Sequence, residues 1–153
     1  MPPMVVIDIE NLQNSYPIET IPLGQWANQV LDLLEIGSAE ISVVIVDNDQ
    51  IQELNRTYLG HDRPTNVISF PQQEGEGPDG EHLGDVVISI EMADQEAKEA
   101  GLSLSERMLQ LLIHGICHLA GFDHERGTEE EARKMEETEE GLYCRIMEQK
   151  SSL

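Results

Sequence analysis

The apolar residues of this chain fall into short β-branched runs and into longer stretches with helical spacing. The short runs are bounded by glycine, proline or polar residues, as is typical of strands. They predict four strands, at residues 5–9, 41–46, 66–70 and 83–90. The longer stretches repeat their apolar positions every three or four residues, which is the pattern of a helix with one buried face.

The helical stretches have clear start and end signals. Ser103–Glu106 and Thr128–Glu131 have the spacing of capping boxes and predict helix starts. Four glycines follow helical stretches and predict their ends, namely Gly37, Gly60, Gly101 and Gly121. The predicted helices carry their apolar residues at Trp26–Leu34, Ile51–Tyr58, Met92–Ala100, Met108–Ala120 and Ala132–Ile146.

Two segments show neither pattern. Residues 14–22 contain Pro17 and Pro22 and predict a loop, and residues 72–82, with three Gly, one Pro and four acidic residues, predict a mobile loop. Strands and helices are mixed without strict alternation. We therefore expect an α/β (α+β) fold in which a small mixed four-stranded sheet packs with about five helices. A length of 153 residues suits one domain spanning residues 1–153.

The charge of the chain is strongly negative. It has 30 Asp+Glu against 9 Lys+Arg, a formal net charge of −21. Nucleic-acid-binding proteins usually carry a basic patch, and an acidic chain is repelled by phosphates at long range. Taken alone, the charge argues against RNA or DNA as a ligand. Part of it lies in Glu129–Glu131 and Glu136–Glu140, which predict a solvated acidic helix face.

The N-terminus and the cysteine content indicate an intracellular protein. The first residues lack the basic and apolar regions of a secretion signal, and no window has the ~18 consecutive apolar residues of a membrane span. The two cysteines, Cys117 and Cys144, are too few for a disulfide framework. A cytoplasmic protein without a membrane partner is therefore expected.

Three of the five histidines lie within eleven residues, as His114, His118 and His124. The first two are one helical turn apart and project from the same face. Gly121 allows the chain to turn back, so that His124 can approach them. The alternative is a set of core histidines, but burying an unpartnered imidazole among leucines and isoleucines is unfavourable. The spacing therefore predicts a site for a divalent ion of the zinc type.

Neighbouring residues bear on how this site is completed. Cys117 is rotated about 100° around the helix from His118, so it is expected to be a small buried hydrophobe. Cys144 is expected in core packing, and Asp123 is expected to orient an imidazole. Three histidines and one water are then the expected ligands, with zinc, nickel or copper as the ion. Such an ion activates water and polarises a carbonyl or phosphoryl oxygen.

The same spacing matches the metzincin frame His-Glu-x-x-His-x-x-Gly-x-x-His, apart from one position. Gly115 stands where zinc peptidases carry the Glu that acts as general base. A peptidase function is therefore disfavoured. Asp85, Asp123 and Glu125 remain as candidates for a different base.

The segment His114-Gly-x-x-His118-Leu119-x-Gly121-x-Asp123-His124 resembles the signature of the YbeY family of bacterial endoribonucleases and rRNA maturation factors. Three further segments agree with that family in order and spacing, namely Leu54-Asn55-x-x-Tyr58, Pro64–Pro71 and Leu83–Ile88. The resemblance covers nearly the whole chain.

This resemblance implies a mixed α/β fold with a metal in a cleft. It implies single-strand-specific RNA cleavage in 16S rRNA maturation and ribosome quality control. Carried over, it makes His114, His118 and His124 the metal ligands, and Thr65–Phe70 and Leu83–Asp85 the cleft wall. The implied partners are ribosomal RNA and the small ribosomal subunit, with no DNA partner expected. The net charge of −21 predicts weak affinity for free RNA, so protein partners are expected to provide the targeting.

One position departs from the family pattern. Where the family has Arg-Gly-Lys-Asp after the tyrosine, this chain has Leu59–Asp62. The family arginine is proposed to help cleave the phosphodiester, and Leu59 cannot replace it. Arg56 or Arg63 are candidates for that role, with His61 as a proton carrier. The alternative for these residues is an ordinary exposed loop.

Three functions therefore stay open. The first is a metal-dependent endoribonuclease, the second a non-enzymatic ribosome assembly factor, and the third a metzincin-like metallohydrolase of another substrate. The acidic charge is compatible with RNA if it lies away from the metal. The ion with Arg56, Arg63 and Arg126 would then form a local positive site, while tight non-specific binding of nucleic acid stays excluded.

Overall fold

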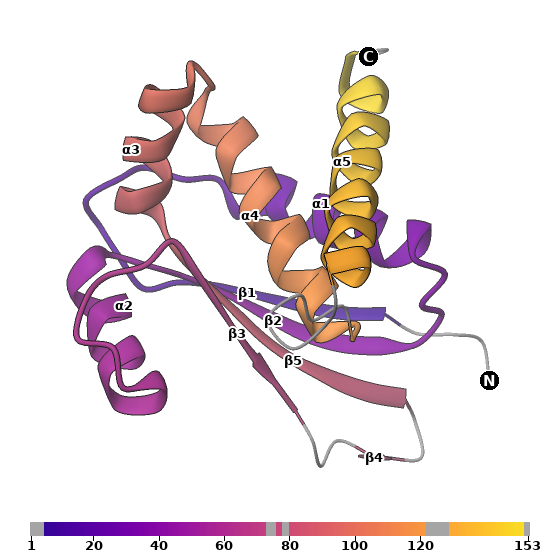
Figure 1. The fold of residues 1–153 in the computed structure, drawn as a ribbon, viewed down its shortest axis with the longest axis horizontal. Coiled ribbons are helices and arrows are strands. Elements are labelled where there is room, and N and C mark those ends of the chain that lie inside the picture. Colours follow the sequence, from indigo (N-terminus) through magenta and orange to yellow (C-terminus); the bar gives the residue numbers. More distant parts are fainter. Residues whose placement is uncertain (1–4, 73–75, 78–79, 122–128, 152–153) are drawn as a thin grey trace.

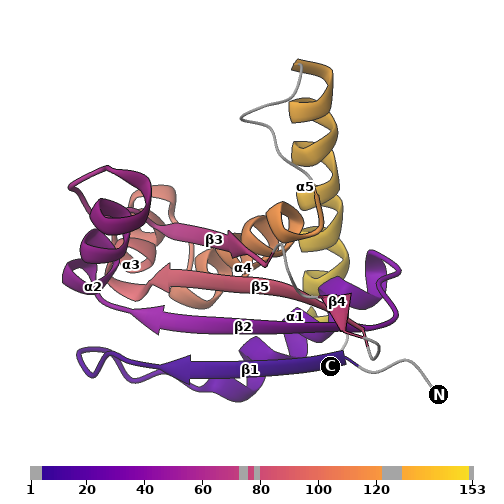
Figure 2. The ribbon, with the colours of Figure 1, turned by 90° about the horizontal axis from the view of Figure 1, so that it is seen from below.

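One mixed β-sheet forms the centre of the molecule (Figure 1). In this computed structural model, residues 5–72, 76–77, 80–121 and 129–151 are described. The sheet order is β1-β2-β5-β3, with β1 (Val5–Asn11), β2 (Ala39–Val46), β5 (Gly80–Ser89) and β3 (Val67–Pro71). The strands β1, β2 and β5 are parallel, whereas β3 runs antiparallel to β5. Figure 2 shows that β1 and β3 form the two edges.

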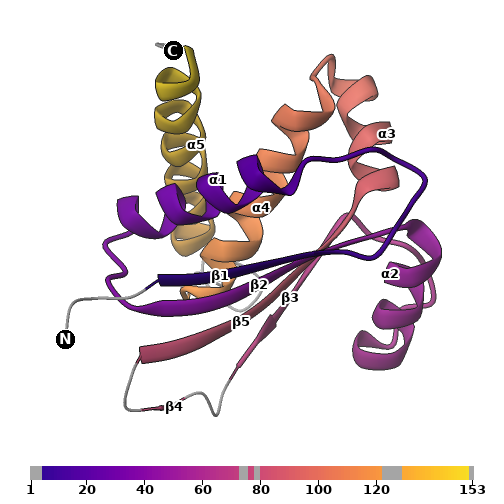
Figure 3. The same ribbon diagram turned by 180° about the vertical axis from the view of Figure 1, so that it is seen from behind.

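Helices cover the two faces of this sheet unequally (Figures 1 and 3). One face carries four helices, which are α1 (Thr20–Leu33), α3 (Ile90–Ala100), α4 (Leu104–Leu119) and α5 (Glu129–Ser151). The short helix α2 (Asn48–Leu54) lies on the other face and continues as one π-helical turn, Asn55–Leu59. The mixed four-stranded sheet with about five helices that the sequence predicts is confirmed.

The alternation of strand side chains divides the interior into two apolar clusters. The larger cluster lies between the sheet and helices α1, α3, α4 and α5, and contains Ile41, Val43, Val86 and Ile88 from the strands. The smaller cluster lies under α2 and contains the residues that point the other way, namely Val46, Ile51, Ile68 and Val87. Successive strand residues therefore reach opposite faces, as pleating requires.

Several element boundaries differ from the sequence predictions. Helix α1 begins at Thr20, inside the predicted loop, because Pro22 falls in its first turn, where the missing N–H does no harm. The same helix ends at Leu33, before Gly37, and Glu35 takes the left-handed turn with a φ of 60°. The predicted loop 72–82 contains the two-residue strand β4 (Glu76–Gly77) and the start of β5. The predicted capping residue Thr128 lies outside the described residues.

The start of α4 is fixed as the sequence predicts. The side chain of Ser103 accepts a hydrogen bond from the backbone N–H of Glu106, and the Glu106 carboxylate accepts one from the N–H of Ser103. This capping box satisfies two N–H groups that would otherwise lack partners at the helix start. It therefore helps to fix the register of the helix that carries His114 and His118.

Helix α4 packs unusually closely on the sheet at Gly115. A Cβ atom at this position would lie 2.5 Å from Cγ1 of Val86 in β5. The backbone carbonyl of Gly115 also accepts a hydrogen bond of 3.0 Å from the hydroxyl of Ser69 in β3. The position that holds the base in zinc peptidases therefore faces the sheet here and has no room for a side chain.

Gly115→Ala is expected to lower the free energy of unfolding by about 1–3 kcal/mol, because the added methyl overpacks the contact with Val86. Gly141→Ala in α5 is the matched control, since nothing lies within 4 Å of its added Cβ. That variant should be stabilised by about 0.5–1 kcal/mol through helix propensity. Urea unfolding of both variants measures the difference, and equal stabilisation would contradict the close packing.

Candidate active site

Helix α4 brings His114 and His118 together on one face. Their Nε2 atoms lie 3.1 Å apart, and their ring centroids are separated by 4.6 Å. Both imidazoles are half-buried at the edge of the sheet next to β3. The structure thus confirms that the spacing of four residues makes two ring nitrogens converge on one point.

This pair fits a divalent metal ion. Two nitrogens bound to one tetrahedral ion at 2.0–2.1 Å would be separated by about 3.3 Å, close to the observed 3.1 Å. Within the described ranges, no group of three His, Cys, Asp or Glu residues forms a complete metal cluster. The third predicted ligand, His124, and its neighbour Asp123 lie outside the described residues, so their roles stay predictions.

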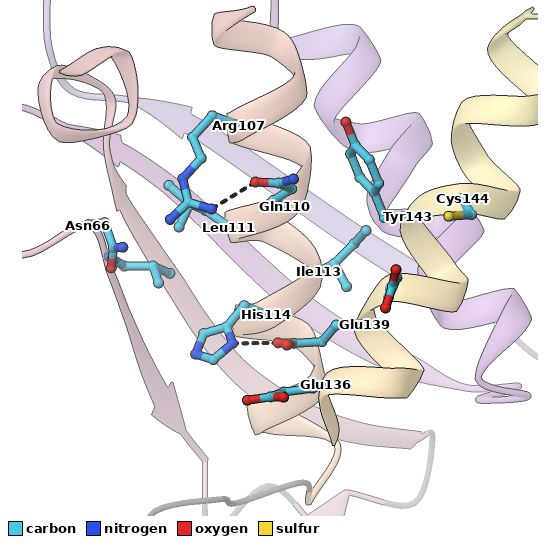
Figure 4. Close-up of a pocket in the computed structure, with 12 residues that line it drawn as sticks. Asn66, Arg107, Gln110, Leu111, Ile113, His114, Glu136, Glu139, Tyr143 and Cys144 are labelled. Carbon is cyan, nitrogen blue, oxygen red and sulfur yellow. Dashed lines mark hydrogen bonds and ion pairs between the residues drawn. The ribbon is translucent and has the colours of Figure 1, made fainter. Parts of the chain in front are cut away.

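A carboxylate from α5 holds the other side of the His114 ring. Glu139 pairs with Nδ1 of His114 (Figure 4). Because an ionised carboxylate can only accept, this nitrogen carries the proton and donates a hydrogen bond to Glu139. In the neutral ring, Nε2 then presents its lone pair toward His118. Metal-binding histidines commonly donate their second N–H to a carboxylate in this way. The contact therefore holds the His114 ring in an orientation that suits metal binding.

The local run of glutamates predicts a solvated position for Glu139, and this prediction is wrong. The Glu139 side chain is only 22% exposed, because α5 turns it toward α4. Its position shares a helical stripe with the buried residues Met135, Leu142 and Ile146. A carboxylate in an otherwise apolar stripe is the signal that would have identified it.

His114 and His118 form one wall of a cavity of about 420 Å³ at the free edge of β3. The cavity is lined by Asn55, Leu59, His61, Arg63, Thr65, Val67, Ile68, Ser69, His114 and His118. None of these described lining residues is acidic, although the chain carries a net charge of −21. The cavity thus gathers imidazole, guanidinium and hydroxyl groups where an anion could bind.

Asn55 positions the loop that supplies two of these groups. Asn55 is buried, with only 4% of the residue exposed. Its side-chain amide donates a hydrogen bond of 2.9 Å to the backbone carbonyl of Arg63. The backbone carbonyl of Asn55 accepts a hydrogen bond of 3.2 Å from the backbone N–H of His61. These two hydrogen bonds form a clamp, the Asn55 clamp, at the start of the π-helical turn Asn55–Leu59, and such turns often occur at functional sites. In the sequence, Asn55 is marked only by its place in the segment Leu54-Asn55-x-x-Tyr58.

The two arginines proposed from the sequence lie in different places. Arg63 lines the cavity together with His61, as does Leu59, which stands where the family pattern has arginine. Arg56 is half-exposed, ion-paired with Glu53, and absent from the cavity lining. Of the two, the structure brings Arg63 and not Arg56 to the histidines.

Asp85 lies on the other face of the sheet from His114 and His118. Its neighbour Val86 contacts α4 at Gly115, so the Asp85 side chain points away from α4. It is paired in register with Phe70 of β3 and Ser42 of β2. The structure therefore does not bring the predicted catalytic residue Asp85 to the cavity.

A second and larger cavity, of about 580 Å³, extends from the start of β3 across α4 to α5 and shares Val67 and His114 with the first (Figure 4). Its lining includes Glu136, Glu139 and Glu140, and Arg107, whose guanidinium is paired with Glu96 at 3.0 Å. The carboxylates thus line the larger cavity, and the smaller cavity has none among its described lining residues.

The two cysteines occupy contrasting environments. Cys117 is fully buried in α4, and this burial raises the pKa of its thiol to about 12. The predicted role of a buried hydrophobe is confirmed for Cys117. Cys144, expected in core packing, is exposed on α5 instead, so that prediction is wrong.

Only one of the two thiols is expected to react with an aromatic disulfide reagent at pH 8. At this pH the Cys117 thiol, with a pKa raised to about 12, forms almost no thiolate, and the thiolate is the nucleophile. Colour development in the native protein should therefore correspond to one thiol, and Cys144→Ser should abolish it. Rapid reaction of two thiols without denaturant would contradict the burial of Cys117.

Comparisons with known proteins point to one family. The family model described as Endoribonuclease YbeY matches residues 8–147. A protein of Syntrophotalea carbinolica named Endoribonuclease YbeY is 48% identical over 149 residues, covering 95% of this chain and 99% of its own. A protein of Geobacter sulfurreducens with the same name is 45% identical over 140 residues, covering 90% and 93%. A third, from Aquifex aeolicus, is 48% identical over 124 residues, covering 81% of each chain.

A solved structure agrees with the fold. The solution structure of a Thermotoga maritima protein superposes with a TM-score of 0.62 at 25% sequence identity, covering 97% of this chain and 96% of that one. All the cavity-lining residues lie inside the range that the family model matches.

Proposed function

The chain belongs to the Endoribonuclease YbeY family, and from this we propose that it is a metal-dependent endoribonuclease that cleaves single-stranded RNA in the cavity at the edge of β3. The observation that carries this assignment is the composition of the cavity. In an acidic chain, its described lining holds two convergent histidines, a further histidine and an arginine, and no carboxylate. This is an environment suited to a phosphodiester.

His114 and His118 would hold the ion, with His124 as the proposed third ligand. A divalent ion bound there supplies Lewis-acid activation of water and of a phosphoryl oxygen. Arg63 can bind the negatively charged phosphate oxygens through its guanidinium. His61 can give a proton to the ribose oxygen that leaves when the P–O bond breaks. The Asn55 clamp holds both residues in place.

The finer features of this function are also proposals. The proposed ion is zinc, because imidazole ligands suit it, and the proposed substrate is 16S ribosomal RNA in the small ribosomal subunit. A net charge of −21 makes free RNA a weak ligand, so protein partners would provide the targeting. We assign the activity to one domain, residues 1–153, acting in the cytoplasm. Among the described residues, no helix is long and apolar enough to cross a bilayer.

The direct test is incubation of the zinc-loaded protein with a single-stranded RNA and with a duplex of the same sequence. The wild-type protein should cleave the single strand, and His114→Ala should not. Equal cleavage by both proteins would overturn the proposal and indicate a contaminating nuclease. Digestion of casein that requires His118 would instead favour a peptidase-like metallohydrolase.

An assembly factor without catalytic activity is the second candidate function. It is favoured by Leu59, an exposed apolar residue that lines the cavity where the family pattern has arginine. Association of wild-type and His114→Ala proteins with small subunits, without cleavage by either, would support this function.

Glu139→Ala is expected to weaken zinc binding by about 10–100-fold, because His114 loses the carboxylate that orients its ring. Glu140→Ala is the matched control, since it removes the same charge from an exposed neighbouring position on α5. Competition with a chromophoric zinc chelator measures both affinities. Equal affinities for the two variants would show that Glu139 does not act on His114.

A further inference from the structure

We propose that the backbone N–H of Ser69, on the free edge of β3, binds a phosphate oxygen of the RNA substrate. The proposal rests on the function proposed above and assigns a substrate-binding group within the same cavity. It follows from the hydrogen-bond register of β3, from the partners of its neighbours and from the composition of the cavity.

The register of the β3–β5 pair decides which N–H groups point outward. The N–H of Ser89 donates to the carbonyl of Asn66, and the N–H of Gln72 donates to the carbonyl of Leu83. In an antiparallel pair, hydrogen-bonded residues alternate with residues whose backbone groups point away. Ile68 and Phe70 therefore bond to β5, whereas the N–H and carbonyl of Ser69 point to the free edge.

The free edge of β3 offers a single available donor. The N–H of Val67 already donates to Oδ1 of Asn66 at 2.7 Å, and Pro71 has no N–H. Within the described residues, no strand pairs with this edge. An extended peptide that added to the sheet would need a row of alternating donors and acceptors. One isolated donor suits a single anionic oxygen instead.

The surroundings of Ser69 are those of a phosphate site. Ser69 lines the same cavity as His61, Arg63, His114 and His118. Its hydroxyl donates to the carbonyl of Gly115, which ties β3 to α4 beside the two histidines. The N–H is therefore held rigidly by the sheet and needs no reorganisation to meet a charge that develops on the phosphate.

Ser69→Pro removes this N–H without breaking the ladder, because proline is tolerated in an edge strand where the N–H points outward. Ser69→Ala is the matched control, since it removes the same hydroxyl and keeps the N–H. We expect Ser69→Pro to cleave single-stranded RNA about 10²–10³-fold more slowly than Ser69→Ala. Equal rates for two folded variants would overturn the proposal.

A nuclear magnetic resonance titration decides the matter if Ser69→Pro does not fold. On addition of a 2′-O-methyl single-stranded oligoribonucleotide to the wild-type protein, the Ser69 amide proton should move downfield. The Phe70 amide, bonded to β5, should move much less. An unmoved Ser69 amide in the saturated complex would overturn the proposal, as would a response only to an extended peptide. Failure of the wild-type protein to cleave any RNA would instead count against the proposed function.

Discussion

Replacement of His118 by Ala is expected to lower the rate of single-stranded RNA cleavage by about 10³-fold or more and to remove bound zinc. The Nε2 atom of His118 lies 3.1 Å from that of His114, and the pair is the part of the proposed metal site that the structure describes. Loss of a metal ion removes several kcal/mol of transition-state stabilisation, and each 1.4 kcal/mol corresponds to a factor of ten. Cleavage assays and metal analysis of the purified variant measure both effects.

His61→Ala separates metal binding from proton transfer. His61 lines the cavity but belongs to the loop after the π-helical turn and is not a proposed ligand. This variant should keep full zinc stoichiometry and lose about 10²–10⁴-fold in rate, the usual contribution of a general acid or base. If His118→Ala kept both its zinc and its activity, the assignment of the metal site to α4 would be wrong.

The site could be predicted from the sequence wherever its geometry is local. His114 and His118 are four residues apart on one helix, so helical geometry alone places them together. The same reasoning predicts the capping box at Ser103 and the buried stripe of α5. These features depend on one element each, and the structure confirms them.

Features that depend on the packing of two elements could not be predicted in the same way. Glu139 reaches His114 only because α5 packs against α4, and the local run of glutamates indicates a solvated face instead. Asp85 is a carboxylate in an apolar strand, a feature that favours a role in a site. The pairing of β5 nevertheless turns its side chain to the face opposite α4. Which side of a strand faces a site is decided by tertiary packing, because a shift of one residue reverses every side chain.

The distribution of carboxylates explains how a chain with a net charge of −21 can hold a site for an anion. Carboxylates line the larger cavity, which reaches α5, and the smaller cavity has none among its described lining residues. His114 stands between the two and donates to an acidic group on one side while facing His118 on the other. A strongly acidic chain can therefore present a site for an anion, because the sign of the local lining differs from that of the whole.

Gly84 in β5 packs directly against β3, the edge strand that lines the smaller cavity. Gly84 lies where the register between β2 and β5 shifts, and its φ of +134° is rarely adopted by other residues. A Cβ atom there would lie 2.2 Å from the carbonyl oxygen of Phe70 and 3.0 Å from the N–H nitrogen of Gln72. Gly84 is opposite Pro71 in the register, so the close approach of β5 to β3 at this point fixes the edge strand two residues after Ser69.

Gly84→Ala is therefore expected to lower the free energy of unfolding by about 2–6 kcal/mol, the sum of backbone strain and overpacking against fixed backbone atoms. Gly101→Ala is the control, because its φ of +71° is also positive but nothing lies within 4 Å of the added Cβ. That variant should lose only the left-handed penalty of about 1–2 kcal/mol. Urea unfolding of both measures the difference, and an equal loss would show that β3 can move away from Gly84. Any Gly84→Ala protein that folds should also cleave RNA more slowly than Gly101→Ala, because displacement of β3 moves the Ser69 N–H away from His114 and His118.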